Sequence, residues 1–515
     1  MQSRWMTGVT MLAVLATVPA PLPIATAPAQ AADRQGFCRT ADPLPRLAPE
    51  AQSQQTSGAS DRRGGEPYLE KMVGAPPPPA PPPPPVMALP APVAADEVMV
   101  TGARVSPPAP SAAEASAAGG YDRAVPPPVP PYPPYPPRPQ PQPQAGILTA
   151  GEHDDLLNPE LYAAYVNRSN LGQEIRVLPR VDTTRVVTVK VQDRNGQPIP
   201  FADVTVTCSD GNRITMATQA DGSAVFFPGL DRLSERISVS ARKNGRQIAD
   251  TRPVLVSRAS GGQLVGLTAN QQATRASKLD LMLVIDTTGS MGDEIRYLQA
   301  ELRSIMAAIT RKHSDLDIRV GFVFYRDLGD EYVTRTVAFD RDIGRAQGVL
   351  AQQYATGGGD YPEAMDQALI RAVGQQWRPD AVKSLLLVAD APPHDEQFAR
   401  TWAAAEAARA KRIHITPVAA SGVADKAEYA MRAMAAATQS RYLFLTDDSG
   451  VGNPHAPPAI DCYLVTRLDA LVRRVIDSQI SGRRIEPDGQ EVIRSVGKYD
   501  AGKCILPADF RWQEG

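Results

Sequence analysis

Cysteine is scarce in this chain of 515 residues, and its four cysteines lie far apart in the sequence. Zinc sites and thioredoxin-like redox motifs need closely spaced cysteines, so the sequence excludes both. Because Cys462 and Cys504 flank the end of the last predicted domain, we expect them to form a disulfide in an oxidising compartment. Cys208 lies in a β-strand pattern, where a lone cysteine is typical of a buried apolar side chain.

Strong net charge and long hydrophobic runs are also absent. The formal net charge is −2, which provides no large field to attract nucleic acid or an anionic membrane surface. No segment after the N-terminus has the roughly 20 apolar residues that a membrane-spanning helix needs. The function must therefore come from local sites.

Residues 1–31 have the order of parts found in secretory signals. Arg4 gives a basic start, residues 11–18 form a short apolar run, and Ala29-Gln30-Ala31 matches the pattern before a cleavage site. A membrane anchor is the alternative, but its apolar run would be longer. We expect a signal peptide over 1–31 and export to the periplasm, the cell surface or the extracellular space.

Proline is abundant, at 50 residues, and it concentrates in 32–145, where 76–85 and 126–143 are the richest stretches. Such a composition cannot bury a core, so we expect a disordered or polyproline-II spacer. It is either a tether that holds a binding domain away from a surface or a passive linker. A short helical segment is predicted over 146–180, with Asn158-Pro159 as a helix start.

Short alternating runs follow over 181–270. Val187, Val189 and Val191 alternate with polar residues, residues 193–196 supply a turn, and 202–206 alternate again, which is typical of a β-hairpin. Further strands are predicted at 224–227, 237–241 and 254–256, which favours a small all-β sandwich. The runs VKVQDRNGQPIPFADVTV and ADGSAVFFPGL resemble carboxypeptidase-regulatory or transthyretin-like modules. That resemblance implies a structural or interaction role.

From residue 278 onward, apolar strands alternate with helices. We predict strands at 281–285, 318–325, 385–389, 413–418 and 442–445, and helices at 295–309, 398–409 and 424–436. Continuous apolar strands separated by helices indicate a mostly parallel sheet covered on both faces. The predicted fold class is a doubly wound α/β domain over 278–481, preceded by the small β-sandwich and followed by a tail over 482–515 whose role the sequence does not indicate.

Three loops of this α/β domain are rich in oxygen ligands. Ligands of such sheets bind at the carboxyl ends of the strands. The loops offer hydroxyls and carboxylates but no thiolate, which suits Mg²⁺, with Mn²⁺ or Ca²⁺ as alternatives. Helix N-caps are the competing interpretation of the same residue types. The candidate ligands are Asp286, Thr288 and Ser290 in the first loop, Thr356 and Asp360 in the second, and Asp390 in the third.

This arrangement resembles the metal-ion-dependent adhesion site of von Willebrand factor A domains, D-x-[ST]-x-S followed by a Thr and an Asp from later loops. The resemblance covers 278–481, with YRDLGDEYVTR, GGGDYPEA, LLLVADAPPH and CYLVTRLDALVRRVI as supporting stretches, and points to the hemicentin-like and bacterial secreted branch. It implies that Thr288 and Ser290 bind the ion directly and that Asp286 and Asp390 hold its waters. The second-loop ligand is either Thr356 or Asp360.

The resemblance implies binding of a protein partner that presents an acidic side chain to the cation. A structural envelope component with an idle site is the second hypothesis. A Mg²⁺-dependent hydrolase is the third, but no nucleophile motif, Walker loop or HExxH sequence is evident, so we do not expect an enzyme. Four neighbouring residues receive other roles: His394 as a loop residue, Glu363 as a cap of the next helix, and Asp327 and Asp330 as a solvated or loop-bracing pair.

Overall fold

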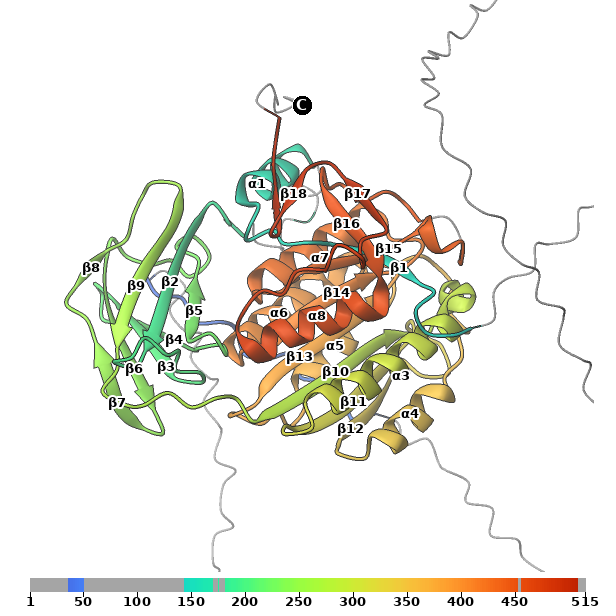
Figure 1. The fold of residues 1–515 in the computed structure, drawn as a ribbon, viewed down its shortest axis with the longest axis horizontal. Helices are drawn as coiled ribbons and strands as arrows, with labels where there is room; N and C mark the ends of the chain where they lie inside the picture. The colour runs from blue at the N-terminus through green and yellow to red at the C-terminus, as the bar shows by residue number, and fades with distance from the viewer. Residues whose placement is uncertain (1–35, 51–142, 170–174, 176–180, 453–454, 508–515) are drawn as a thin grey trace, which may run out of the picture. The chain divides into compact units, whose positions relative to one another are not determined.

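The central feature of the fold is a nine-stranded sheet with the order β12-β11-β10-β13-β14-β15-β1-β16-β17 (Figure 1). The computed structural model describes residues 36–50, 143–169, 175, 181–452 and 455–507. Neighbouring strands from β11 to β15 pair in parallel, and β12 pairs antiparallel with β11. All five predicted strands are confirmed: β10 (Lys278–Asp286), β11 (Asp317–Tyr325), β13 (Val382–Ala389), β14 (His414–Ala419) and β15 (Tyr442–Thr446). A further strand, β12 (Thr334–Asp340), was not predicted from the sequence.

Helices cover both faces of this sheet, because the side chains of each central strand alternate between two cores. In β10, Leu281, Leu283 and Ile285 belong to one apolar cluster, whereas Met282 and Val284 belong to another. The first cluster contains α3 (Ile295–Lys312), α4 (Ile343–Ala351) and α8 (Leu468–Ser481), and the second contains α5 (Met365–Val373), α6 (Phe398–Ala410) and α7 (Asp425–Ala437). The predicted doubly wound α/β class is confirmed.

The segment predicted as helical over 146–180 contributes a strand as well as a helix. Helix α1 (Pro159–Arg168) is present, with Pro159 in its first turn. Before it, β1 (Thr149–His153) lies between β15 and β16 (Tyr463–Arg467) and pairs antiparallel with both. The run TAGEH has no alternation and is buried throughout, so nothing local to the sequence marks it as a strand. In the tail, β17 (Arg494–Val496) pairs with β16, and β18 (Tyr499–Asp500) pairs with β19 (Lys503–Cys504).

The β-rich part forms two sheets around one apolar cluster, not the predicted hairpin. Strand β2 pairs with β5 and β9, whereas β3 pairs with β4 and β6 in the other sheet. The turn at 193–196 exists, but the chain then crosses to the second sheet, so that the valines of β2 and β3 meet inside. The strands are β2 (Arg185–Gln192), β3 (Asp203–Cys208), β4 (Arg213–Ala217), β5 (Ser223–Phe226), β6 (Arg236–Lys243), β7 (Arg246–Asp250), β8 (Val254–Leu255) and β9 (Gly261–Thr268).

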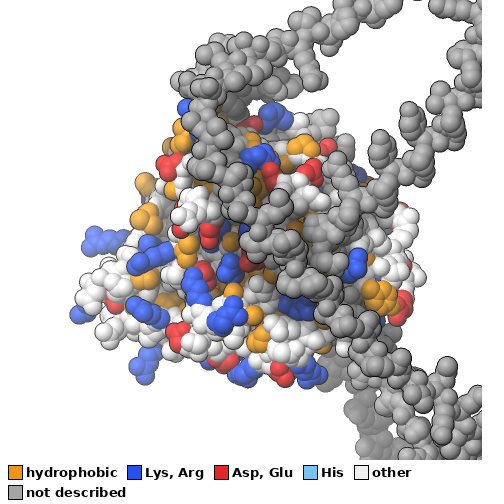
Figure 2. All heavy atoms as spheres, turned by 45° about the vertical axis from the view of Figure 1, so that its right-hand side comes forward, with side chains coloured by type: hydrophobic (Ala, Val, Ile, Leu, Met, Phe, Trp, Pro, Cys, Tyr) orange, Lys and Arg blue, Asp and Glu red, His pale blue; other side chains and the backbone are white. Residues whose placement is uncertain are grey.

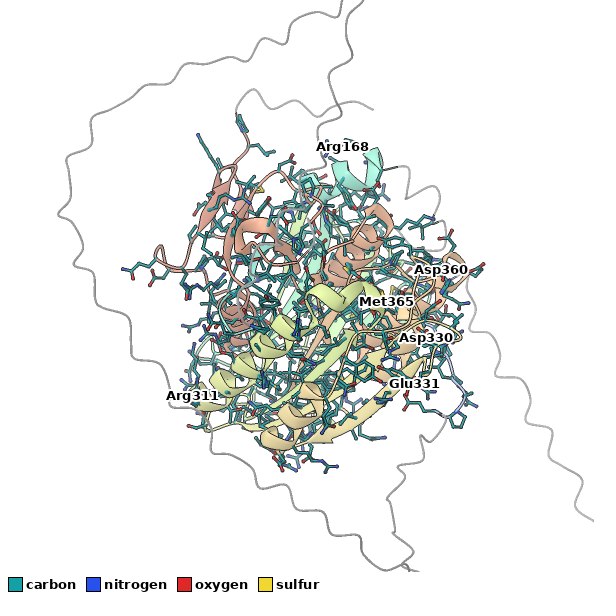
Figure 3. The ribbon with its side chains drawn as sticks, turned by 90° about the vertical axis from the view of Figure 1, so that its right-hand side faces the viewer. Arg168, Arg311, Asp330, Glu331, Asp360 and Met365 are labelled. Atoms are coloured by element: carbon teal, nitrogen blue, oxygen red, sulfur yellow. A yellow bond between two sulfur atoms is a disulfide. The ribbon has the colours of Figure 1, made fainter. Side chains whose placement is uncertain are left out.

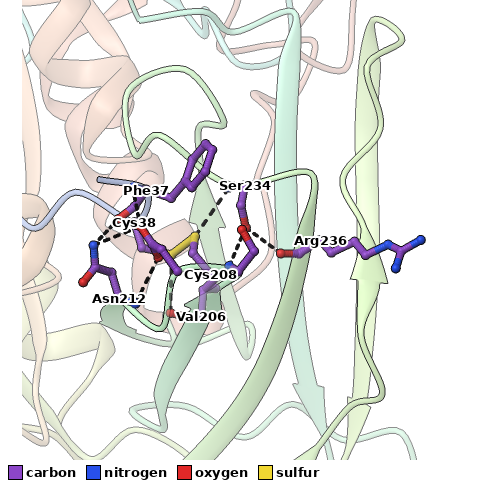
Figure 4. The surroundings of a disulfide bond; sticks show 9 residues. Phe37, Cys38, Val206, Cys208, Asn212, Ser234 and Arg236 are labelled. Atoms are coloured by element: carbon purple, nitrogen blue, oxygen red, sulfur yellow. Dashed lines mark hydrogen bonds between the residues drawn. A yellow bond between two sulfur atoms is a disulfide. The ribbon is translucent and has the colours of Figure 1, made fainter. Parts of the chain in front are cut away.

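Residues 36–50 pack against the folded chain, although they fall within the predicted spacer. The backbone N–H of Cys38 donates to the Arg232 carbonyl at 2.8 Å, and Arg39 pairs with Glu406 on α6 at 2.8 Å. Cys38 forms a disulfide with Cys208 (Figure 4). The expectation of a lone apolar cysteine at 208 is therefore wrong, because its partner is 170 residues away in the sequence.

The predicted disulfide between Cys462 and Cys504 is confirmed. The predicted signal peptide over 1–31 and most of the proline-rich segment, 51–142, lie outside the described residues. No helix in the described ranges combines the length and hydropathy needed to cross a membrane. On the face drawn in Figure 2, basic and acidic side chains are interspersed wherever described residues are visible.

Candidate functional site

The first candidate loop begins at the end of β10 and leads into α3. The Thr288 hydroxyl donates to Asp286 Oδ1 at 2.7 Å, and the Thr288 backbone N–H donates to the same oxygen at 2.9 Å. The hydroxyls of Thr288 and Ser290 are 3.1 Å apart. Thr288 precedes the short 3₁₀ helix η1 (Gly289–Asp293) but makes no side-chain cap to it. The Thr288 side chain therefore links Asp286 to Ser290 and does not cap the helix.

The second loop approaches the first through its backbone. The Gly289 N–H donates to the Gly357 carbonyl at 2.9 Å, and the Thr356 N–H donates to the Thr287 carbonyl at 3.0 Å. Gly357 and Gly358 have positive φ angles of 82° and 71°, conformations that suit glycine. Because these glycines have no side chains and lie beside the first loop, the second loop can pack closely against the first.

The side chains of Thr356 and Asp360, the two candidate second-loop ligands, are exposed. Neither makes a hydrogen bond or ion pair with the described part of the chain. Asp360 lies at the edge of the molecule in Figure 3, on the same side as Asp330. Neither side chain is therefore hydrogen-bonded to the first loop among the described residues, and which of the two is a ligand stays a prediction.

The third loop starts at Asp390, directly after β13. Asp390 is 2% exposed, and a side-chain hydrogen bond from Ser290 links it to the first loop. Burial, together with the nearby Asp286 carboxylate, raises the pKa of Asp390 to about 7. Burial also raises the pKa of Asp286 to about 6. Asp286, Thr288, Ser290 and Asp390 are thus brought together at the carboxyl ends of β10 and β13.

Glu363 belongs to this site, although the sequence analysis gave it another role. Helix α5 begins at Met365, and its N-cap is Ala364 with no side-chain cap, so the prediction that Glu363 caps this helix is wrong. The Glu363 backbone N–H donates to the Pro392 carbonyl at 2.9 Å, and its side chain is buried. Burial raises the pKa of Glu363 to about 9, with Asp286 as the largest electrostatic contribution.

Asp327, Asp330 and His394 surround the site and brace its loops. His394 Nε2 lies 2.6 Å from Asp327 Oδ1. Asp330 Oδ2 accepts from the Gly358 N–H at 2.8 Å and from the Asp327 N–H at 3.1 Å. Of the two predicted roles for the acidic pair, loop bracing is therefore the one that the structure supports.

The carboxylates of the site have unused oxygens that fit a cation. Asp286 Oδ2, Asp390 Oδ1 and Glu363 Oε2 are buried without a geometrically acceptable hydrogen-bond partner among the described atoms, and so is the Tyr325 hydroxyl beside Asp286. Buried polar atoms are normally paired, so the three carboxylate oxygens require a partner. No group of three or more Asp, Glu, His or Cys side chains within the described ranges is arranged for direct coordination alone. A cation here would therefore need hydroxyl and water ligands as well. Thr288 and Ser290 are placed to supply the hydroxyls.

Comparison with known proteins assigns a family to the α/β domain. Residues 280–453 match the family model described as von Willebrand factor A domain. A stretch of 130 residues is 32% identical to the alpha-protein kinase vwkA of Dictyostelium discoideum and covers 25% of this chain and 21% of the kinase. A stretch of 125 residues is 33% identical to an ariadne-like RING finger protein of Acanthamoeba polyphaga mimivirus and covers 24% of this chain and 12% of that protein.

This chain is also similar to the crystal structure of the conserved hypothetical protein BatB from Bacteroides thetaiotaomicron. The similarity covers 39% of this chain and 98% of that chain, with 11% sequence identity and a TM-score of 0.28. The sequence relatives match over a small part of their own length, so the similarity concerns one domain. The family match confirms the predicted domain type. The predicted branch of the family and the relationship of the β-rich part to carboxypeptidase-regulatory modules stay predictions.

Proposed function

Because residues 280–453 form a von Willebrand factor A domain, we propose that this protein binds a divalent cation at the carboxyl ends of β10 and β13 and uses it to hold a protein partner. The observation that carries the proposal is the pair of buried, unpartnered oxygens, Asp286 Oδ2 and Asp390 Oδ1, beside the Ser290 hydroxyl. Two ionised carboxylates balance the charge of one divalent cation. Hydroxyl and carboxylate oxygens are the ligands that Mg²⁺ prefers.

In this proposal, Thr288 and Ser290 bind the ion directly, and Asp286 and Asp390 hold its water molecules. Mg²⁺ is the proposed ion, and Mn²⁺ or Ca²⁺ would use the same ligands. The cation would keep one position open for an acidic side chain of the partner. Thr356 or Asp360 would contribute the ligand from the second loop.

The proposed role is binding and not catalysis. A metal-dependent hydrolase would need a positioned nucleophile or general base beside the cation. No nucleophile motif, Walker loop or HExxH sequence is evident in the chain. Export of the mature chain is part of the same proposal, and the two disulfides fit an oxidising compartment. An idle site in a structural envelope component is the competing function.

Calorimetric titration of the chain with Mg²⁺ and Mn²⁺ tests this proposal. We expect one cation to bind, and we expect Asp286→Ala and Ser290→Ala to weaken binding by about 10- to 100-fold or more, as loss of metal-site partners does elsewhere. Asp315→Asn is the matched control, because Asp315 is exposed and far from the site in the sequence. A wild-type chain that binds neither ion would leave the idle structural role as the function.

A further inference from the structure

We propose that Glu363 is a third carboxylate of the cation site and occupies the open position that a partner's acidic side chain would otherwise fill. This inference rests on the proposed cation site and specifies how that site is regulated. Partner binding would then require Glu363 to leave the cation. The site would be closed by its own chain until a partner competes for it.

The position of Glu363 is fixed by two of the three loops. Its backbone N–H is bonded to the Pro392 carbonyl in the third loop, and it forms an isolated parallel bridge with Pro393. Its side chain reaches the second loop, where a β-carbon on Gly358 would lie 2.8 Å from Glu363 Oε1. The same β-carbon would lie 3.2 Å from Thr288 Cβ. Glu363 and Thr288 therefore both approach the space beside Gly358, which is open to them because this residue lacks a side chain.

No other role in the described structure accounts for this buried carboxylate. Glu363 is 3% exposed, and its Oε2 atom has no hydrogen-bond partner among the described residues. It does not cap α5. A buried charge without a partner is costly, so a carboxylate in this place requires a cation or a proton. Asp327 and Asp330 differ from Glu363 because His394 and backbone N–H groups already pair with them.

The charge of the site supports a blocking role. Asp286 and Asp390 together balance a divalent cation, and Glu363 adds one further negative charge. A partner carboxylate that approached this site would meet a net negative charge as well as a filled position. Removal of the Glu363 charge would have two opposite effects. It would weaken the binding of the cation, and it would strengthen the attraction of the site for an acidic ligand.

Glu363→Gln tests this inference, because the two side chains have nearly the same shape. Calorimetric titration with Mn²⁺ would measure cation binding. A tetraglutamate peptide added to the Mn²⁺-saturated chain would serve as the acidic probe. We expect the variant to bind Mn²⁺ about tenfold more weakly and to bind the peptide at least several-fold more tightly than the wild type. Asp315→Asn is the control, since it removes an exposed carboxylate that stands before the start of β11 and outside the three loops of the site.

The outcomes separate this inference from the proposed function. If the wild-type chain binds no Mn²⁺, the cation site itself is wrong. If the wild type binds Mn²⁺ and Ser290→Ala does not, but Glu363→Gln matches the wild type in both titrations, only the role of Glu363 is wrong. Parallel losses of Mn²⁺ and peptide binding in Glu363→Gln would mean that Glu363 supports the loops and does not block the site. Thermal unfolding of each variant would verify that it is folded.

Discussion

Replacement of Arg432 by Met is expected to lower the free energy of unfolding by about 3–5 kcal/mol, the usual cost of removing one partner from a buried ion pair. Arg432 lies on α7 and is 1% exposed. Its guanidinium donates to both oxygens of Asp155, at 3.1 and 2.7 Å, and to Glu428 at 3.0 Å. The variant would leave Asp155 and Glu428 buried without Arg432, with His153 at 3.3 Å as the remaining basic partner of Asp155.

Equilibrium unfolding in urea, followed by circular dichroism at pH 7 and constant cation concentration, would measure this loss. Arg311→Met is the matched control, because Arg311 is an exposed helical arginine for which the structure shows no ion pair. We expect the control to change the stability by no more than about 0.5 kcal/mol. Adding Asp155→Asn to Arg432→Met should recover part of the loss. A change below about 1 kcal/mol in Arg432→Met would contradict the importance of this ion pair.

The Arg432 cluster also shows why the sequence did not reveal the full extent of the sheet. Asp155 lies between β1 and α1, which precede the β-rich part, whereas Arg432 lies 277 residues later. Glu152 in β1 accepts from Arg441 at 2.6 Å across a similar separation. The chain therefore enters the sheet before the β-rich part and completes it afterward. Periodicity within a short window cannot detect a strand whose stability comes from partners so far away.

The strands that the sequence did predict are those with a strong local signal. β10 and β13 are continuous apolar runs because the sheet is covered on both faces, and such runs are recognisable without knowledge of their neighbours. The hairpin prediction failed for the opposite reason. The alternation in β2 and β3 correctly identified two strands, but alternation does not specify which strands pair.

The site shows the same contrast. Asp286, Thr288 and Ser290 stand at alternating positions after a recognisable strand, so their convergence could be predicted from one loop. Glu363 could not be found in this way, because it reaches the site only through contacts with Gly358 and Pro392 from two other loops. Its neighbours in the sequence suggest an ordinary helix start. The missed residue is thus one whose role depends entirely on tertiary packing.

Without a cation, the chain is expected to lose stability as the pH rises from 5 to 8, and Mg²⁺ is expected to restore it. Burial raises the pKa of Asp286 to about 6 and that of Asp390 to about 7. Both values are higher than in the unfolded chain, so the protonated carboxyls favour folding at low pH. This stability is lost as the pH rises through the folded-state pKa values. For Asp286 alone, the full shift of about two units corresponds to roughly 3 kcal/mol, of which about half is lost between pH 5 and pH 8.

Unfolding free energies measured in urea at pH 5 and pH 8, with either a chelator or excess Mg²⁺, would test this expectation. Mg²⁺ should stabilise the chain mainly at pH 8, where both carboxylates are ionised and available to the ion. Asp286→Asn should reduce both the pH dependence in chelator and the effect of Mg²⁺, while His394, whose pKa is also raised, continues to titrate. The difference between the two chains therefore measures the titration of Asp286 together with its effect on the pKa values of Asp390 and Glu363. Equal stability of the wild type at both pH values in chelator would mean that the carboxylates are not destabilised by burial, and the main physical reason for a cation at this site would be lost.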